Sequence, residues 1–68
     1  MNEETFNSSI RKFLKLVGVN SQREIEQAVA QAITSGKLAG NETFPVKVTL
    51  EMPSLQFAAK FDGDIKLE

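Results

Sequence analysis

Apolar residues in the first half of the chain recur at helical spacing. One set lies in residues 3–17 and consists of Phe6, Ile10, Phe13, Leu14 and Val17. A second set lies in residues 22–35 and consists of Ile25, Ala28, Val29, Ala32 and Ile33. Steps of three, four and one place each set on one face of an amphipathic helix. The pattern therefore predicts two helices, over about 3–17 and about 22–35.

Polar residues between these two sets are typical of a turn. Gly18 suits the left-handed position that ends a helix. Ser21 and Glu24 have the spacing of a capping box, in which the serine hydroxyl accepts a backbone N–H and the glutamate reaches back to the serine N–H. Asn2 is suited to cap the first helix, and Gly36 to end the second. We therefore expect a hairpin of two helices joined by a short turn.

In the second half of the chain, apolar residues recur at every second position. After a loop over residues 36–43, alternating apolar residues predict strands over about 44–52, 55–61 and 64–67. Pro53 cannot adopt the positive φ of a tight hairpin turn. A longer loop over Met52–Leu55 would pair Leu50 with Phe57. A second loop, over residues 61–63, would place Ile65 opposite Ala59.

Together these elements predict a single α+β domain over residues 1–68. Its order is α-α-β-β-β, with the two-helix hairpin packed on one face of a three-stranded antiparallel meander. The opposite sheet face would be polar and mixed in charge.

Composition narrows the classes of function. The chain has 68 residues, eight basic and nine acidic side chains, and no Cys, His, Tyr or Trp. A nucleic-acid-binding protein usually has a basic excess, so nucleic acid is not the expected partner. Without thiol, imidazole or phenol groups, only carboxylates and lysines could act as bases, and we expect no enzyme and no cofactor. No apolar run reaches the roughly 18 residues of a membrane span. The acidic start, Met1–Glu4, is unlike a secretory signal, so the expected location is the cytoplasm.

Two short segments have a chemical as well as a structural interpretation. The carboxylates of Asp62, Asp64 and Glu68 could bind a divalent cation, but Asp62–Asp64 is better explained as a hairpin turn. Asn20, Ser21 and Arg23 could bind phosphate at a helix start, but capping already accounts for this segment. We therefore predict no catalytic, metal or cofactor site.

The remaining candidates form an interaction surface. Arg11, Lys12 and Lys15 make a basic patch, while Leu16 and Leu38 are apolar residues without an expected core position. We expect a small non-catalytic protein-interaction module, adaptor or regulatory, whose partner is a protein. A weak homodimer through an exposed sheet edge is one version of this hypothesis. The alternative is a nucleic-acid-associated regulator that uses Arg11, Lys12 and Lys15.

Four segments, in order, resemble a known family. They are MNEETFNSSIRKFLK (1–15), VGVNSQREIEQAV (17–29), GKLAGNET (36–43) and FDGDIKLE (61–68). The family consists of short bacterial proteins of about this length and is described only as a domain of unknown function. The resemblance implies a stand-alone bacterial cytosolic protein, and it implies no activity, cofactor or catalytic residue.

Overall fold

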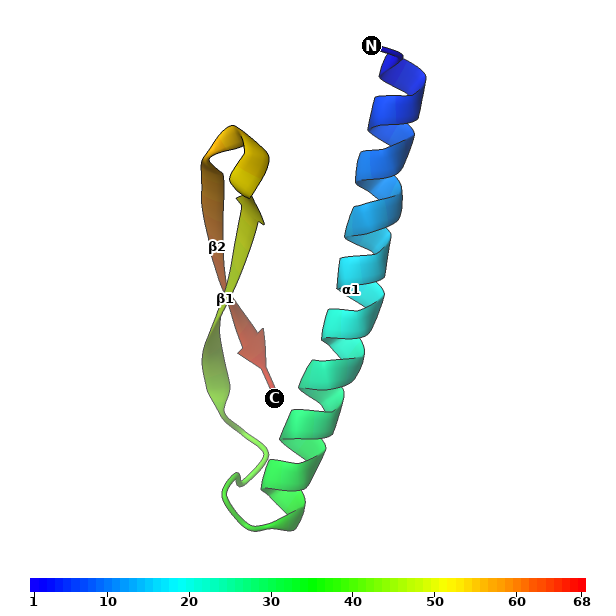
Figure 1. The fold of residues 1–68 in the computed structure, drawn as a ribbon. Helices are drawn as coiled ribbons and strands as arrows, with labels where there is room; N and C mark the ends of the chain where they lie inside the picture. Colours follow the sequence, from blue (N-terminus) through cyan, green and yellow to red (C-terminus); the bar gives the residue numbers. More distant parts are fainter. The chain divides into compact units, whose positions relative to one another are not determined.

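The computed structural model describes residues 1–68 as two compact units, Met1–Lys37 and Leu38–Glu68. The first unit is a single helix, α1 (Glu3–Thr34). The second unit is a hairpin of β1 (Thr43–Met52) and β2 (Phe57–Lys66), joined by a short 3₁₀ helix, η1 (Pro53–Leu55). Figure 1 shows this order of elements along the chain. The fold is α-β-β, so the predicted α-α-β-β-β order is wrong.

Both ends of α1 are fixed by the residues that the sequence indicates. The Thr5 N–H donates to Asn2 Oδ1 over 3.1 Å, and Glu3 and Glu4 lie in the first turn, where the helix dipole favours negative charge. At the other end the Gly36 N–H donates to the Ile33 carbonyl and the Lys37 N–H to the Ala32 carbonyl. This Schellman arrangement requires a left-handed residue, and Gly36 has φ +80°.

The predicted break between two helices does not occur. Residues Gly18 and Ser21 lie inside α1, and Ser21 is a half-buried interior residue, so it does not act as a cap. A break would leave four N–H and four C=O groups without helical partners. Keeping Gly18 in the helix costs only about 1 kcal/mol. Because so short a chain cannot supply a core to offset the break, the continuous helix is favoured.

The predicted second and third strands form one strand. β2 runs without interruption through Asp62, Gly63 and Asp64, the segment that we expected to be a turn. Phe57, Phe61 and Ile65 are all odd-numbered, so one unbroken strand keeps them on the same face without a loop. In that strand Gly63 lies opposite Val46.

The turn between the strands has the predicted length of four residues and lies one residue later in the chain, at 53–56 instead of 52–55. Pro53 opens η1, and Gln56 closes it in the left-handed conformation, with φ 50° and its N–H donating to the Pro53 carbonyl. This connection pairs Met52 with Phe57 and Leu50 with Ala59. The predicted pairing of Leu50 with Phe57 is therefore wrong by two residues, a shift that preserves the faces of the strands.

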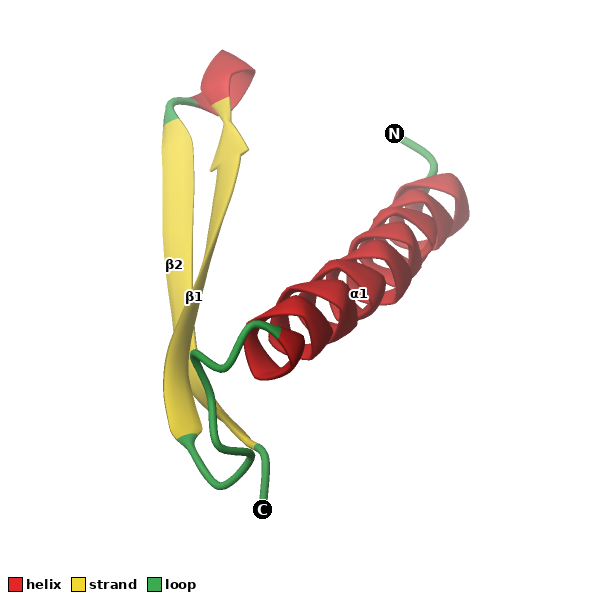
Figure 2. Ribbon diagram, turned by 90° about the horizontal axis from the view of Figure 1, so that it is seen from below, coloured by secondary structure: helices red, strands yellow, loops and turns green.

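The hairpin, whose two strands are yellow in Figure 2, has one face of apolar residues and one polar face, as the strand register shows. The apolar face carries alternate residues of both strands, and these are Phe44, Val46, Val48, Leu50 and Met52 with Phe57, Ala59, Phe61, Gly63 and Ile65. On the polar face Lys47 lies opposite Asp62, a favourable cross-strand pair of charges.

A carboxylate organises the connection between α1 and β1. Glu42 accepts hydrogen bonds from the backbone N–H groups of Ala39 and Gly40, both over 2.9 Å, and of Asn41 over 3.1 Å. The Leu67 N–H donates to the Glu42 carbonyl, which ties the C-terminal segment to this loop. Glu42 therefore holds the start of the hairpin.

No residue of the chain is fully buried. Thirteen large apolar side chains, from Met1 to Phe61, have exposed fractions of 40% or more. α1 lacks an apolar stretch of the length and hydropathy that a membrane crossing requires.

Candidate functional site

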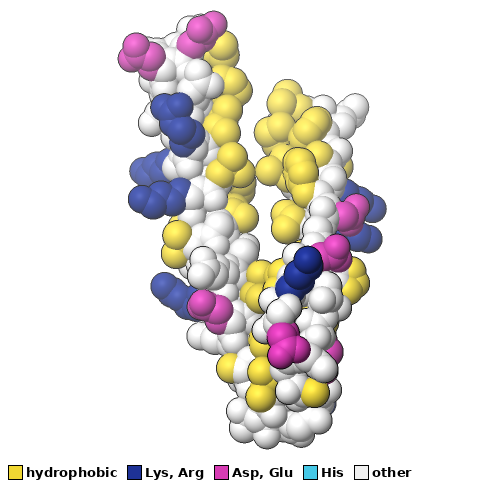
Figure 3. Space-filling view, turned by 180° about the vertical axis from the view of Figure 1, so that it is seen from behind, with side chains coloured by type: hydrophobic (Ala, Val, Ile, Leu, Met, Phe, Trp, Pro, Cys, Tyr) yellow, Lys and Arg dark blue, Asp and Glu magenta, His cyan; other side chains and the backbone are white.

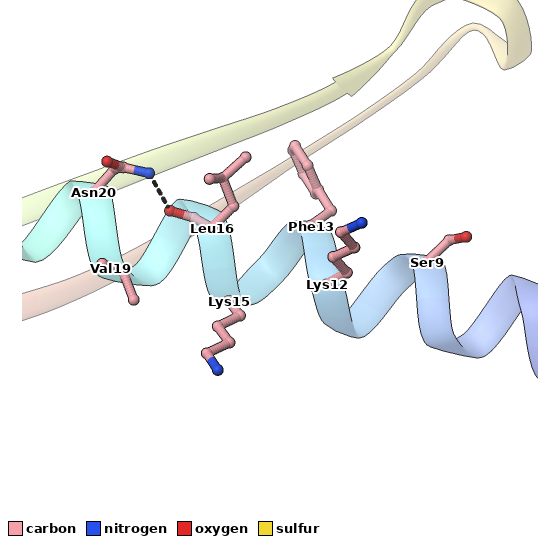
Figure 4. Close-up of a pocket in the computed structure, with 7 residues that line it drawn as sticks. All are labelled: Ser9, Lys12, Phe13, Lys15, Leu16, Val19 and Asn20. Atoms are coloured by element: carbon pink, nitrogen blue, oxygen red, sulfur yellow. Dashed lines mark hydrogen bonds between the residues drawn. The ribbon is translucent and has the colours of Figure 1, made fainter.

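A shallow hollow on α1 is the clearest candidate site. Its lining comes entirely from this helix and consists of Ser9, Lys12, Phe13, Lys15, Leu16, Val19 and Asn20. Figure 4 shows Phe13 and Leu16 projecting beside each other, with Lys12 next to Phe13. The exposed fractions are 51% for Phe13, 59% for Leu16 and 51% for Val19. An apolar floor of this kind, with ammonium groups at its rim, can hold an apolar side chain that has carboxylates beside it.

The helix itself fixes the positions of these side chains. Phe13, Leu16 and Val19 recur every three residues, so they follow one slowly turning row on the helix surface. The Asn20 amide donates to the Leu16 carbonyl over 2.8 Å (Figure 4), which places the Asn20 side chain at one end of the hollow. The floor is thus built on a rigid element.

Basic side chains gather along one flank of the helix. Arg11, Lys12 and Lys15 fall within about 100° of one another around the helix axis. Figure 3 shows Lys and Arg side chains along one flank of α1 and hydrophobic atoms along another. All three basic residues are exposed, and Lys12 and Lys15 also line the hollow.

Four of the five predicted surface residues lie on the same helix. Lys12, Lys15 and Leu16 meet at the hollow, and Arg11 lies just outside it. Leu38 belongs to the other compact unit and is half-buried. Sequence reasoning assigned Phe13 to a core and did not select Val19, although the spacing of Phe13, Leu16 and Val19 was a usable signal.

The structure also bears on the two alternative sites considered from the sequence, a phosphate site at residues 20–23 and a cation site near Asp62 and Asp64. Ser21 and Arg23 lie within α1, where backbone N–H groups are already bonded, so no helix start is present there to bind phosphate. Asp62 and Asp64 lie on β2 instead of in a turn. No group of three or more Asp or Glu side chains is arranged to hold a metal ion.

The carboxyl group of Glu42 is perturbed by the loop that surrounds it. Hydrogen bonds from the backbone N–H groups of Ala39 and Gly40 lower the pKa of the Glu42 carboxyl from its ordinary value of 4.5. Because Glu42 itself occupies these N–H groups, the loop is a structural feature and offers no open anion site.

The chain belongs to a family described as "Family of unknown function (DUF6494)", whose model matches residues 1–68. This finding confirms the resemblance to a family of unknown function. No curated protein and no solved structure matches the chain.

Proposed function

We propose that this chain is a small, non-catalytic protein-interaction module of the bacterial cytoplasm, with an adaptor or regulatory role. The hollow on α1 is its binding surface for another protein. The observation that carries this proposal is the exposed apolar floor of Phe13, Leu16 and Val19 with Lys12 and Lys15 beside it.

The chemistry of the hollow indicates the chemistry of the partner. Exposed aromatic and aliphatic side chains gain free energy when a partner's apolar side chain removes them from water. The two lysines favour a partner with carboxylates around that apolar side chain, because opposite charges at a rim guide association. The preferred partner is therefore a protein segment with apolar anchors and acidic neighbours.

Site-specific photo-crosslinking in cells of the source organism tests the proposal. A photoreactive residue at Ser9, at the edge of the hollow, should yield a discrete adduct with another protein. The same residue at Gln31, which is on α1 but outside the hollow, is the matched control. Leu16→Asp should abolish the Ser9 adduct because it places a charge on the apolar floor.

The charges at the rim can be tested in the same assay. Lys12→Glu with Lys15→Glu should weaken the Ser9 adduct strongly. Lys37→Glu with Lys60→Glu changes the net charge equally away from the hollow and should leave the adduct intact. An adduct that persists in Leu16→Asp would rule out the hollow as the binding surface.

A nucleic-acid-associated regulator is the second candidate. It is supported by the alignment of Arg11, Lys12 and Lys15 along one flank of α1, which could follow a phosphate backbone. It predicts binding to DNA or RNA that weakens with salt and is lost in Arg11→Glu with Lys15→Glu. A mobility-shift assay at low salt that shows no complex would eliminate it.

A further inference from the structure

The hydrogen-bond pattern of the hairpin identifies the backbone groups that face outward. The Leu67 N–H donates to the Glu42 carbonyl over 2.9 Å, and these two residues continue the register that places Thr43 opposite Lys66. Hydrogen-bonded and non-hydrogen-bonded pairs alternate along an antiparallel ladder. Even-numbered residues of β1 therefore bond with odd-numbered residues of β2. The remaining residues direct their backbone groups away from the partner strand, and on β2 these are Ala58, Lys60, Asp62, Asp64 and Lys66.

The outer edge of β2 is complete, whereas the outer edge of β1 is interrupted. Pro45 occupies an outward position of β1 and has no N–H to donate. β2 contains no proline, so each of its five outward residues offers a donor and an acceptor. No hydrogen bond within the chain uses these groups. Figure 2 shows β2 with β1 as its only neighbouring strand, so the β2 edge is open to pairing with another strand.

The alternation of polar and apolar residues limits how a second copy can pair with this edge. Two β2 strands related by a two-fold axis run antiparallel, and directly opposite side chains project from the same face. Polar-face residues then lie opposite polar-face residues, so the axis passes through a residue and not between two residues. Because β2 spans Phe57–Lys66, axes at Phe61 and at Asp62 give the longest overlap.

Charge favours the axis at Phe61. With this axis Lys60 of each copy lies opposite Asp62 of the other, an attractive pair that occurs twice. On the apolar face the two Phe61 side chains lie opposite each other, and Phe57 lies opposite Ile65. These are non-hydrogen-bonded positions, where opposite side chains approach most closely. An axis at Asp62 would instead place two like carboxylates opposite each other.

We propose that two copies of this chain pair through the outer edge of β2, antiparallel and centred on Phe61, and form a four-stranded sheet with the order β1-β2-β2-β1. The interface is isologous, so each backbone hydrogen bond and each Lys60–Asp62 pair occurs twice. A two-stranded hairpin is only marginally stable, and additional strands stabilise its apolar face. The proposal goes beyond the proposed function because this surface belongs to the hairpin, whereas the hollow belongs to α1.

Sedimentation equilibrium of the full chain over a wide concentration range tests the pairing. The expected species has twice the mass of 7.5 kDa. Asp62→Pro should weaken dimerisation at least about tenfold, because each copy loses an outward N–H at the centre of the edge. Lys47→Pro is the matched control, since Lys47 lies directly opposite Asp62 and its N–H faces the outer edge of β1. It removes the same cross-strand pair of charges and should leave the dissociation constant unchanged.

An exchange of charges tests the register. Lys60→Glu and Asp62→Lys should each weaken the dimer severalfold, because each places like charges opposite each other. The double variant should recover most of the loss. Recovery by Lys60→Asp with Asp64→Lys instead would place the axis at Asp62 and overturn the proposed register.

Hydrogen exchange of the unmodified chain keeps the test decisive if the proline variants unfold. Raising the concentration should slow exchange at the Lys60 and Asp62 amides at least about tenfold, because a paired amide exchanges only when its strand opens. The Thr49 amide, which faces the outer edge of β1, should be unaffected. A strict monomer at all concentrations overturns the proposal. A dimer equally sensitive to both proline variants, or one without slowed exchange at Lys60 and Asp62, also overturns it.

The dimer and the proposed function fail separately. A crosslinked adduct at Ser9 with a different protein, obtained from a chain that is monomeric in isolation, overturns only the dimer. A dimer that responds to Asp62→Pro, with no adduct to another protein at Ser9, supports the dimer and contradicts the proposed function.

Discussion

At the scale of single residues, Glu42 has the most defined role. One carboxylate accepts three backbone N–H groups, and the same residue's carbonyl accepts the Leu67 N–H. Such bonds favour the charged form of the side chain, which is why the pKa of Glu42 is lowered. A local loop is thereby joined to the C-terminal segment of the hairpin.

We predict that Glu42 stabilises its loop in a pH-dependent way. Because its pKa is lower in the folded chain than in the unfolded chain, the stabilisation is complete above the ordinary value of 4.5 and is lost as pH falls through the lowered folded pKa. NMR titration should show the Ala39 and Gly40 amide shifts changing together below pH 4.5. At neutral pH Glu42→Gln should speed hydrogen exchange at both amides, whereas Glu51→Gln on β1 should not. Unchanged exchange in Glu42→Gln would contradict this role.

At the scale of elements, glycine has opposite roles at two positions. Gly18 lies inside α1 with ordinary helical φ, and an added Cβ would meet no atom within 4 Å. Gly36 lies after the helix with φ +80°, where a side chain is strained. The sequence pattern alone assigned the same helix-ending role to both.

A pair of alanine variants distinguishes one continuous helix from two. Gly18→Ala should raise the free energy of unfolding by about 0.5–1 kcal/mol, because alanine favours a helix interior. Gly36→Ala should lower it by about 1 kcal/mol, because alanine is strained in the left-handed conformation. Chemical denaturation followed by circular dichroism measures both. A loss of stability in Gly18→Ala would indicate a turn at residues 18–21.

A substitution at Gly63 tests whether β2 is one continuous strand or is interrupted by a turn. It lies opposite Val46, and an added Cβ would come 3.9 Å from Val46 Cγ1, an ordinary contact. Gly63→Ala should therefore stabilise the hairpin by about 0.5–1 kcal/mol, since glycine weakens a strand interior. In a turn that required a left-handed residue the same change would be destabilising, so the sign of the denaturation shift decides between strand and turn.

The periodicity of apolar residues identified the apolar faces of the helix and the strands. Local turn signals predicted a helix end and a strand end at places where the structure has neither. The helical spacing in α1 and the period of two in the hairpin were correct for residues such as Ile25 and Val48. Gly18–Ser21 and Asp62–Asp64 have the composition of turns, but a turn forms only where it lowers the free energy of the whole folded chain. Leu16 and Lys15 were selected as surface residues, whereas Phe13 was assigned to a core, because amphipathic periodicity does not distinguish a buried face from an exposed one.

At the scale of the whole molecule, the absence of any buried side chain is the dominant fact. A two-stranded hairpin is marginally stable by itself, and most helices in proteins depend on tertiary packing of an apolar face. Neither the helix unit nor the hairpin unit is therefore expected to be stable as an isolated piece.

The thermal stability of the chain should consequently depend on its concentration. Mass action stabilises a folded dimer over unfolded monomers, so the unfolding midpoint should rise by several degrees across a hundredfold increase in concentration. Scanning calorimetry and circular dichroism at matched concentrations measure the effect. A midpoint independent of concentration, with a sharp unfolding transition, would mean that one chain is stable alone. The exposed apolar faces would then be available to bind other proteins and would not be needed for the stability of the fold.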